Sequence, residues 1–375
     1  ISYFKSHLHP PNKKTNFLTF RVERSSLRHY RLSMNTTSGI RKNEVRKWLD
    51  AHVNGVEGEL EYQQIIGGHS NLTYTVLEKS GRKWVLRRPP LGHVLATAHD
   101  MSREYRVIKA LAESGVPVPK VVGLCEDTDI NDAPFYVMDF VEGIVVRDAE
   151  IARSQPLAVR KKMGESLLEI LVSLHAVNVD EVGLGDLARK DGYIERQLKR
   201  WKAQFEQSTN REIPGVFEIH DKLLRNVPVQ QGVGIVHGDY RLDNTIMTET
   251  GEVAAVLDWE LCTLGDVLSD LAAIISYSND LTGMETQAMS VEGFPTPDEV
   301  RNLYGNLSER DLSKLDFYIA FAYWRLACIL EGVYTRYAAG VMGSEADAAA
   351  IQIFGERVLL LIDLADSTFQ DFLKE

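Results

Sequence analysis

Two spacings of apolar residues alternate in the first part of this chain. Apolar positions three and four residues apart predict helices, and short apolar runs bounded by Gly, Pro or Ser predict strands. The spacing of Pro117 and Pro119 predicts a further extended stretch. The resulting order, after a first helix, is three strands, a helix and two strands. We expect helices over 43–53 and 100–111, and strands over 62–66, 73–78, 83–87 and 134–140.

The remainder of the chain predicts mainly helices. Leucines between 167 and 174 mark a buried helical stripe, and we expect His175 at its end to be a core or capping residue. Two short apolar runs, 233–236 and 253–257, predict buried strands. The most apolar stretch, 317–330, is too short to cross a bilayer and contains an arginine, so it predicts a core helix and no membrane span.

Composition narrows the class of protein. A chain of 375 residues with 44% hydrophobic and 25% charged residues is typical of a globular protein large enough for two lobes. A formal net charge of −11 argues against nucleic acid as the partner, because no basic surface would neutralise phosphates. Cys125, Cys262 and Cys328 are far apart and odd in number, which favours a reducing compartment such as the cytoplasm.

The first 33 residues differ from the rest. They contain seven Lys or Arg and one acid, for a net charge of +6, and the other residues carry −17. A basic, acid-poor leader is typical of a mitochondrial transit peptide. Met34 offers an alternative start, in which case the leader is translated upstream sequence or an expression remnant. We expect 1–40 to be disordered under either interpretation.

One segment carries a recognisable chemical pattern. In His237-Gly238-Asp239-Tyr240-Arg241-Leu242-Asp243-Asn244, an Asp precedes an Asn by five residues, and Asp258 follows the next apolar run. This spacing matches a kinase catalytic loop followed by a metal-binding Asp. In such a loop Asp239 would accept the proton of an attacking hydroxyl, and Asn244 and Asp258 would hold magnesium. An ordinary tight turn explains His-Gly-Asp alone but not all three positions.

Four segments together resemble the aminoglycoside phosphotransferase and choline kinase-like family, and within it the kinase-like domain associated with acyl-CoA dehydrogenases. The similarity runs from about Leu60 to Gly340. The segments are Gly67–Tyr74, Trp84–Pro90, His237–Asn244 and Leu257–Glu260.

The resemblance implies an α+β, protein-kinase-like fold of two lobes, a small β-rich N-lobe over 41–143 and a larger helical C-lobe over 144–375. It also implies ATP and Mg²⁺ as cofactors. No G-x-x-x-x-G-K-[ST] motif is present, which excludes a P-loop. The segment 183–188 fits a dinucleotide fingerprint only formally, since it follows a helix.

The predicted nucleotide site begins with Gly67-Gly68 between two strands. Glycines there allow backbone amides to approach phosphates, and Ser70 and Asn71 add polar groups. A plain hairpin turn remains the alternative.

Arg87 stands where most of the family has lysine on the third strand. Glu104 lies on the apolar face of its predicted helix, so a buried carboxylate needs a cation, and Arg87 is the candidate. The related branch also has Arg here, which argues against loss of activity. Arg88 is the alternative for orienting the nucleotide.

Three further assignments complete the predicted site. Backbone groups of Asp139, Phe140 and Val141 resemble a hinge that reads adenine, although a core strand and turn would look the same. Arg241 either neutralises the transferring phosphoryl group or forms local salt bridges. We expect Asp243 and Asp270 to brace the loop.

The sequence therefore predicts an ATP- and Mg²⁺-dependent phosphotransferase that acts on a hydroxyl of a small molecule. The branch resemblance implies a hydroxyacyl-CoA acceptor and an acyl-CoA dehydrogenase partner. An aminoglycoside or amino-alcohol kinase is the alternative acceptor class. From a different class, a non-catalytic nucleotide-binding regulatory module remains open, although such a module needs no base. Localisation is predicted as cytoplasmic, or mitochondrial if the leader is a transit peptide.

Overall fold

The computed structural model describes residues 38–65, 71–92, 100–278, 288–340 and 348–374. Residues 1–37 lie outside this part, so the basic leader stays a prediction. Gly67, Gly68 and Ser70 of the predicted glycine loop also lie outside it, whereas Asn71 is described.

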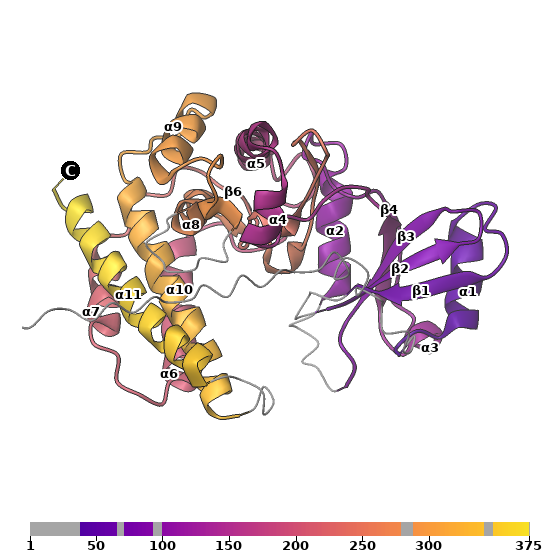
Figure 1. Cartoon of the computed structure of the whole chain (residues 1–375), viewed down its shortest axis with the longest axis horizontal. Coiled ribbons are helices and arrows are strands. Elements are labelled where there is room, and N and C mark those ends of the chain that lie inside the picture. Colours follow the sequence, from indigo (N-terminus) through magenta and orange to yellow (C-terminus); the bar gives the residue numbers. More distant parts are fainter. Residues whose placement is uncertain (1–37, 66–70, 93–99, 279–287, 341–347, 375) are drawn as a thin grey trace, which may run out of the picture. The chain divides into compact units, whose positions relative to one another are not determined.

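The N-terminal region is a five-stranded antiparallel sheet with strand order β1-β2-β3-β5-β4 (Figure 1). The predicted series of three strands, a helix and two strands is confirmed. The helix α2 begins after Asp100, whose side chain accepts a hydrogen bond from the Arg103 N–H, a common N-cap. The elements are α1 (Lys42–His52), β1 (Leu60–Gln64), β2 (Leu72–Glu78), β3 (Lys83–Arg88), α2 (Met101–Leu111), β4 (Val121–Cys125), α3 (Thr128–Asn131) and β5 (Phe135–Asp139).

The two faces of this sheet belong to different cores. On one face, Trp84 and Leu86 of β3 pack with α1, which contributes Trp48. On the other face, Val85 joins the large core of the helical region. Because side chains alternate along a strand, Arg87 shares the face of Val85, and Arg88 shares the face of Trp84.

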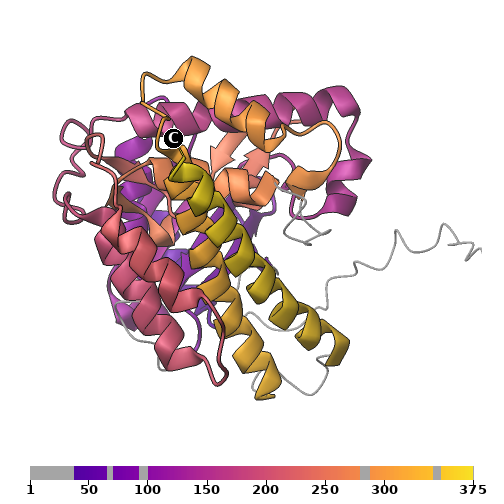
Figure 2. The ribbon, with the colours of Figure 1, turned by 90° about the vertical axis from the view of Figure 1, so that its left-hand side faces the viewer.

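The rest of the chain is mostly helical. The long helices α10 and α11 run side by side, as both views show (Figures 1 and 2). The helices are α4 (Ala149–Ser154), α5 (Leu157–Ala176), α6 (Tyr193–Ser208), α7 (Val216–Arg225), α8 (Leu268–Ser278), α9 (Pro297–Leu307), α10 (Leu315–Ala338) and α11 (Ala348–Phe372), with short 3₁₀ turns η2 (Leu242–Asn244), η3 (Trp259–Leu261) and η5 (Ala288–Ser290).

Two short ladders interrupt the helices. The predicted strands are present as β6 (Gly234–Val236) and β8 (Val253–Val256), but they do not pair with each other. Instead β6 pairs with β9 (Thr263–Gly265), and β8 pairs with β7 (Thr245–Met247). The pattern did not predict β7 and β9, because three residues are too few for a periodic signal.

The apolar stretch 317–330 lies inside α10 and packs in the core, as predicted. Among the helices of the described ranges, none combines the length and apolar character that crossing a membrane requires.

Candidate active site

The predicted catalytic loop is a tight turn between β6 and β7. Gly238 has a φ of +86°, and a Cβ there would lie 3.0 Å from the Leu261 carbonyl oxygen, so the turn requires glycine. The Asn244 Nδ2 donates to both the backbone carbonyl and the Oδ2 of Asp239, each at 2.8 Å. Because the amide nitrogen is used in this way, the Oδ1 of Asn244 is left as an acceptor.

Asp258 is brought to Asn244 by the β7–β8 ladder. The Leu257 N–H donates to the Asn244 carbonyl at 2.8 Å, so the two residues lie at the same end of adjacent strands. Asp258 has a left-handed backbone with φ of +62°, which is uncommon for a residue other than glycine. This conformation ends β8 and directs the chain into η3.

Arg87 is surrounded by three carboxylates. Its Nε lies 3.2 Å from the Oε2 of Glu104, and its Nη2 lies 2.5 Å from the Oδ1 of Asp258. Glu260 is the third, with its Oε2 3.8 Å from the same Nη2. The predicted pair with Glu104 is therefore present. Glu260 had no predicted role, although an acid two residues after Asp258 was visible in the sequence.

Arg88 points away from this cluster. Its guanidinium donates to the carbonyls of Gly39 and Asn131, on the face of the sheet that α1 covers. The alternative in which Arg88 orients the nucleotide is wrong, because strand alternation places it on the opposite face.

Burial and neighbouring charges shift the pKa values of Arg87 and Glu104 in opposite directions. Burial raises the pKa of Glu104 to about 7, against the lowering effect of the Arg87 guanidinium. Burial alone would lower the pKa of Arg87, but the carboxylates of Glu104 and Asp258 outweigh it and raise that pKa. One cation among three acids leaves this cluster short of positive charge.

The remaining oxygens suit a magnesium ion. Within the described residues, no donor is bonded to the Asn244 Oδ1 or the Asp258 Oδ2. No group of three or more His, Cys, Asp or Glu side chains forms a metal cage in that part of the chain. Two oxygen ligands without a cage are typical of magnesium that is held together with nucleotide phosphates.

Arg241 forms the local salt bridges that were one of its two predicted roles. Its Nη2 lies 2.8 Å from the Oδ2 of Asp243, and its Nε lies 3.4 Å from the Oδ1 of Asp239. Burial raises the pKa of Asp243, with Arg241 acting in the opposite direction. Asp243 therefore braces the loop through Arg241, and Arg241 still lies beside the predicted base.

Asp270 holds the loop from behind. Its Oδ2 accepts the His237 N–H at 2.6 Å, and its Oδ1 accepts the Gly238 N–H at 2.9 Å. The expected bracing contact is present. His175 is a core residue, as expected, with its Nδ1 2.8 Å from the Tyr304 hydroxyl.

Two of the three predicted hinge residues already donate their backbone N–H groups to other backbone carbonyls. The Asp139 N–H donates to the Lys120 carbonyl at 2.8 Å, and the Phe140 N–H donates to the Lys83 carbonyl at 3.4 Å. Of the three predicted hinge residues, Val141 alone has no backbone partner for its N–H among the described residues.

Most of the predicted site residues that the structure describes line one cavity of about 480 Å³. Glu104 lies behind Arg87, outside the lining, and Asn71 contacts the cavity wall through its Nδ2, 3.2 Å from the Glu260 Oε2. The lining includes Arg87, Asp139, Phe140, Val141, Asp239, Arg241, Asn244, Asp258 and Glu260.

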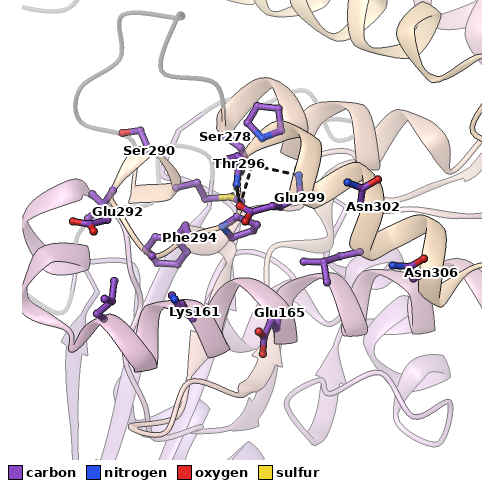
Figure 3. A pocket seen from close by; sticks show the side chains of 17 residues that line it. Lys161, Glu165, Ser278, Ser290, Glu292, Phe294, Thr296, Glu299, Asn302 and Asn306 are labelled. Carbon is purple, nitrogen blue, oxygen red and sulfur yellow. Dashed lines mark hydrogen bonds between the residues drawn. The ribbon is translucent and has the colours of Figure 1, made fainter.

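A second, larger cavity of about 940 Å³ lies between α5, η5 and α9 (Figure 3). Its lining does not place a base beside a metal-binding pair. Glu299, for example, is used by the capping box of α9, in which it bonds Thr296. The smaller cavity is therefore the candidate active site.

Comparison with known proteins identifies the family of this chain. Residues 61–303 match the model of the phosphotransferase enzyme family. The chain is 34% identical over 370 residues to acyl-CoA dehydrogenase family member 10 of Mus musculus, which covers 96% of this chain and 32% of that protein. The chain thus spans about a third of the length of this relative.

Solved structures share the fold. A Ralstonia eutropha protein assigned to the aminoglycoside phosphotransferases is 31% identical, with a TM-score of 0.75, over 88% of this chain and 98% of that chain. Spectinomycin phosphotransferase, solved with ADP and spectinomycin, is 12% identical with a TM-score of 0.57, over 88% of this chain and 99% of that chain. The second likeness supports the fold only.

The family match covers well over half of the chain, and it includes both the sheet that carries Arg87 and the loop that carries Asp239. The chain belongs to the phosphotransferase enzyme family.

Proposed function

We propose that this chain is an ATP- and Mg²⁺-dependent kinase that phosphorylates a hydroxyl group of a small molecule. The observation that carries the proposal is the contact between Asn244 and Asp239, because it orients a carboxylate as a base and a carboxamide oxygen as a metal ligand at once.

The roles of the residues follow from their contacts. Asp239 accepts the proton of the acceptor hydroxyl. Asn244 donates a hydrogen bond to its Oδ2, and Asp270 accepts the N–H of the preceding residue, Gly238. Arg241, 3.4 Å from the Oδ1 of Asp239, supplies positive charge near the point of transfer.

The nucleotide side uses the other predicted residues. ATP supplies the phosphoryl group, and Mg²⁺ offsets the charge of its phosphates. Asn244 and Asp258 would hold the metal, and Arg87, fixed by Glu104, would contact phosphate. Backbone groups at Asp139–Val141 would bind adenine. Gly67, Gly68, Ser70 and Asn71 would cover the phosphates.

For the acceptor we propose a hydroxyacyl-CoA, with an acyl-CoA dehydrogenase as the functional partner. The relative named above is an acyl-CoA dehydrogenase family member, and this chain matches about a third of it. An aminoglycoside or amino alcohol is the second acceptor class, which the name of the Ralstonia protein favours.

Replacing Asp239 with Asn tests the enzymatic role. We expect turnover to fall by about 10²-fold or more, the usual scale for a lost general base, while Mg²⁺-dependent ATP binding is retained. Asp180→Asn, an exposed acid paired with Lys190, is the matched control and should leave turnover unchanged. If the wild-type protein binds ATP but phosphorylates no acceptor of the panel described below, a nucleotide-binding regulatory module becomes the better assignment.

A further inference from the structure

Arg325 lies beside the predicted base and has no acidic partner among the described residues. It extends from α10, and its Nη2 donates to the Gly238 carbonyl at 2.6 Å, one residue before Asp239. No carboxylate among the described residues forms an ion pair with it. The guanidinium has five N–H donors, and one contact to a neutral carbonyl leaves both charge and donors available.

An aromatic platform connects Arg325 to a second arginine. The Arg325 guanidinium lies 5.6 Å from the centroid of the Trp201 ring, and the Arg200 guanidinium lies 5.6 Å from the same ring. Trp201 is half-buried and Arg200 is exposed. The three side chains therefore lead from the catalytic loop towards solvent.

The helix that carries Trp201 is positive in a negative protein. Within its 16 residues, α6 has four cations and two acids, a net charge of +2, whereas the whole chain carries −11. No described carboxylate pairs with any of these cations, although exposed arginines elsewhere do pair, such as Arg106 with Asp186. An unpaired positive surface beside a catalytic loop attracts anions and repels cations. The four cations are Arg196, Lys199, Arg200 and Lys202.

We infer that Arg325, Trp201 and Arg200 form a subsite for a negatively charged group of the acceptor, a carboxylate or a phosphate. The inference rests on the proposed function and specifies its substrate class. Guanidinium forks bind either anion through paired N–H donors, so the same residues serve a group near the hydroxyl or one farther along the molecule. A cationic aminoglycoside or amino alcohol would meet like charge at this position.

A charge-matched acceptor series tests the subsite. 3-Hydroxybutyryl-CoA carries phosphates far from its hydroxyl, 3-hydroxybutyrate carries a carboxylate close to it, 3-hydroxybutyryl-pantetheine is neutral, and ethanolamine and kanamycin are cationic. Phosphoryl transfer from ATP gives kcat/KM for each, and calorimetry in the presence of ADP and Mg²⁺ gives binding. The variants are Arg325→Gln, which keeps an N–H donor for the Gly238 carbonyl, Arg325→Lys, which keeps the charge, and Arg200→Gln.

We expect the wild-type protein to prefer an anionic acceptor over the neutral thioester. Arg325→Gln should reduce that preference by about tenfold or more, the scale of a charge-assisted hydrogen bond, and Arg325→Lys should restore part of it. If the wild type prefers 3-hydroxybutyryl-CoA and Arg200→Gln weakens this preference, the subsite binds the phosphates. A preference for 3-hydroxybutyrate identifies a carboxylate. Arg336→Gln, in the last turn of the same helix, is the control and should change neither ratio.

Two outcomes separate the subsite from the proposed function. If acceptors are phosphorylated without regard to charge, or Arg325→Gln slows all of them equally, the subsite is wrong and the kinase assignment stands. If the anionic compounds bind and lose affinity in Arg325→Gln but none is phosphorylated, the subsite stands and the kinase assignment is wrong. No binding and no transfer of any anionic compound would overturn the inference.

Discussion

Two carboxylates, Glu104 and Asp270, hold opposite sides of the site and are equally buried, each with about 1% of its surface exposed. Their pKa values move in opposite directions. Burial raises the pKa of Glu104 to about 7. Burial acts on Asp270 in the same sense, but the His175 and His237 rings and the Gly238 N–H outweigh it and lower that pKa.

The difference lies in the groups that surround each carboxylate, and for Asp270 the His175 ring contributes most to lowering the pKa. Asp270 receives two backbone N–H groups, which are fixed in place by the loop itself. Neither oxygen of Glu104 has a well-aligned donor among the described residues, and Arg87 is shared with Asp258 and Glu260. The loop that carries the predicted base is therefore held by contacts within the chain, whereas the region predicted to bind the nucleotide has excess negative charge that a divalent cation would balance.

Removing Asp270 should have the largest effect, because it leaves two buried N–H groups without an acceptor. We expect Asp270→Ala to lower the free energy of unfolding by about 4 kcal/mol, the sum expected for two such groups. Urea unfolding measures this directly. Asp180→Ala, which removes an exposed acid, should cost less than about 1 kcal/mol. A loss in Asp270→Ala no greater than in this control would contradict the bracing role.

Arg87→Ala should come next, because it leaves Glu104, Asp258 and Glu260 without their shared cation. We expect a loss of about 3 kcal/mol in the free energy of unfolding, the scale for breaking a buried ion pair. Glu104→Gln should be much milder, since it removes a charge that burial already disfavours.

A double-mutant cycle of Arg87→Ala and Glu104→Gln gives the coupling between the two side chains. Coupling near zero would show that Arg87 is held by Asp258 and Glu260 instead.

The dependence of stability on pH should separate the two carboxylates. A Glu104 pKa of about 7 lies above its unfolded value of 4.5, so the folded state binds the proton more tightly. Its contribution is complete below pH 4.5 and is lost as pH rises through 7, on the order of 3 kcal/mol over that window. The lowered pKa of Asp270 has the opposite sign: its contribution is present above its unfolded value of 3.8 and is lost in more acidic solution.

Unfolding free energies measured from pH 5 to pH 8 for the wild type and Glu104→Gln test the first of these. The free energy of unfolding of the variant should change less with pH across that range than that of the wild type. Identical curves would show that Glu104 does not titrate there.

The sequence predicted the fold and much of this comparison, because the relevant signals are local. Asp239, Asn244 and Asp258 follow a fixed spacing, and Glu104 lies on the apolar face of a single helix. Strand alternation alone distinguishes Arg87 from Arg88, so the choice between them was available from the sequence.

What the sequence did not predict depends on tertiary contacts. Glu260 reaches Arg87 because Asp258 adopts a left-handed turn. Arg325 contacts Gly238 across 87 positions of the chain, from a helix whose pattern predicts only a core role. The pairing of β6 with β9 was not predicted either, because β9 is too short to give a periodic signal.

The smallest effect should come from removing the hydroxyl of Tyr304. The Tyr304 hydroxyl bonds the Nδ1 of His175, whose pKa burial lowers, so the ring is neutral near pH 7. Tyr304→Phe should therefore cost about 1 kcal/mol in the free energy of unfolding and leave turnover nearly unchanged, because the loop is held by Asp270 itself. Tyr318→Phe is a matched comparison, since its hydroxyl donates to the carboxylate of Asp266 at 2.7 Å and should cost about 2 kcal/mol. If Tyr304→Phe proved the more costly of the two, the His175 ring would carry a charge. The residues behind the predicted catalytic loop would then form a charged cluster, as the residues around Arg87 do.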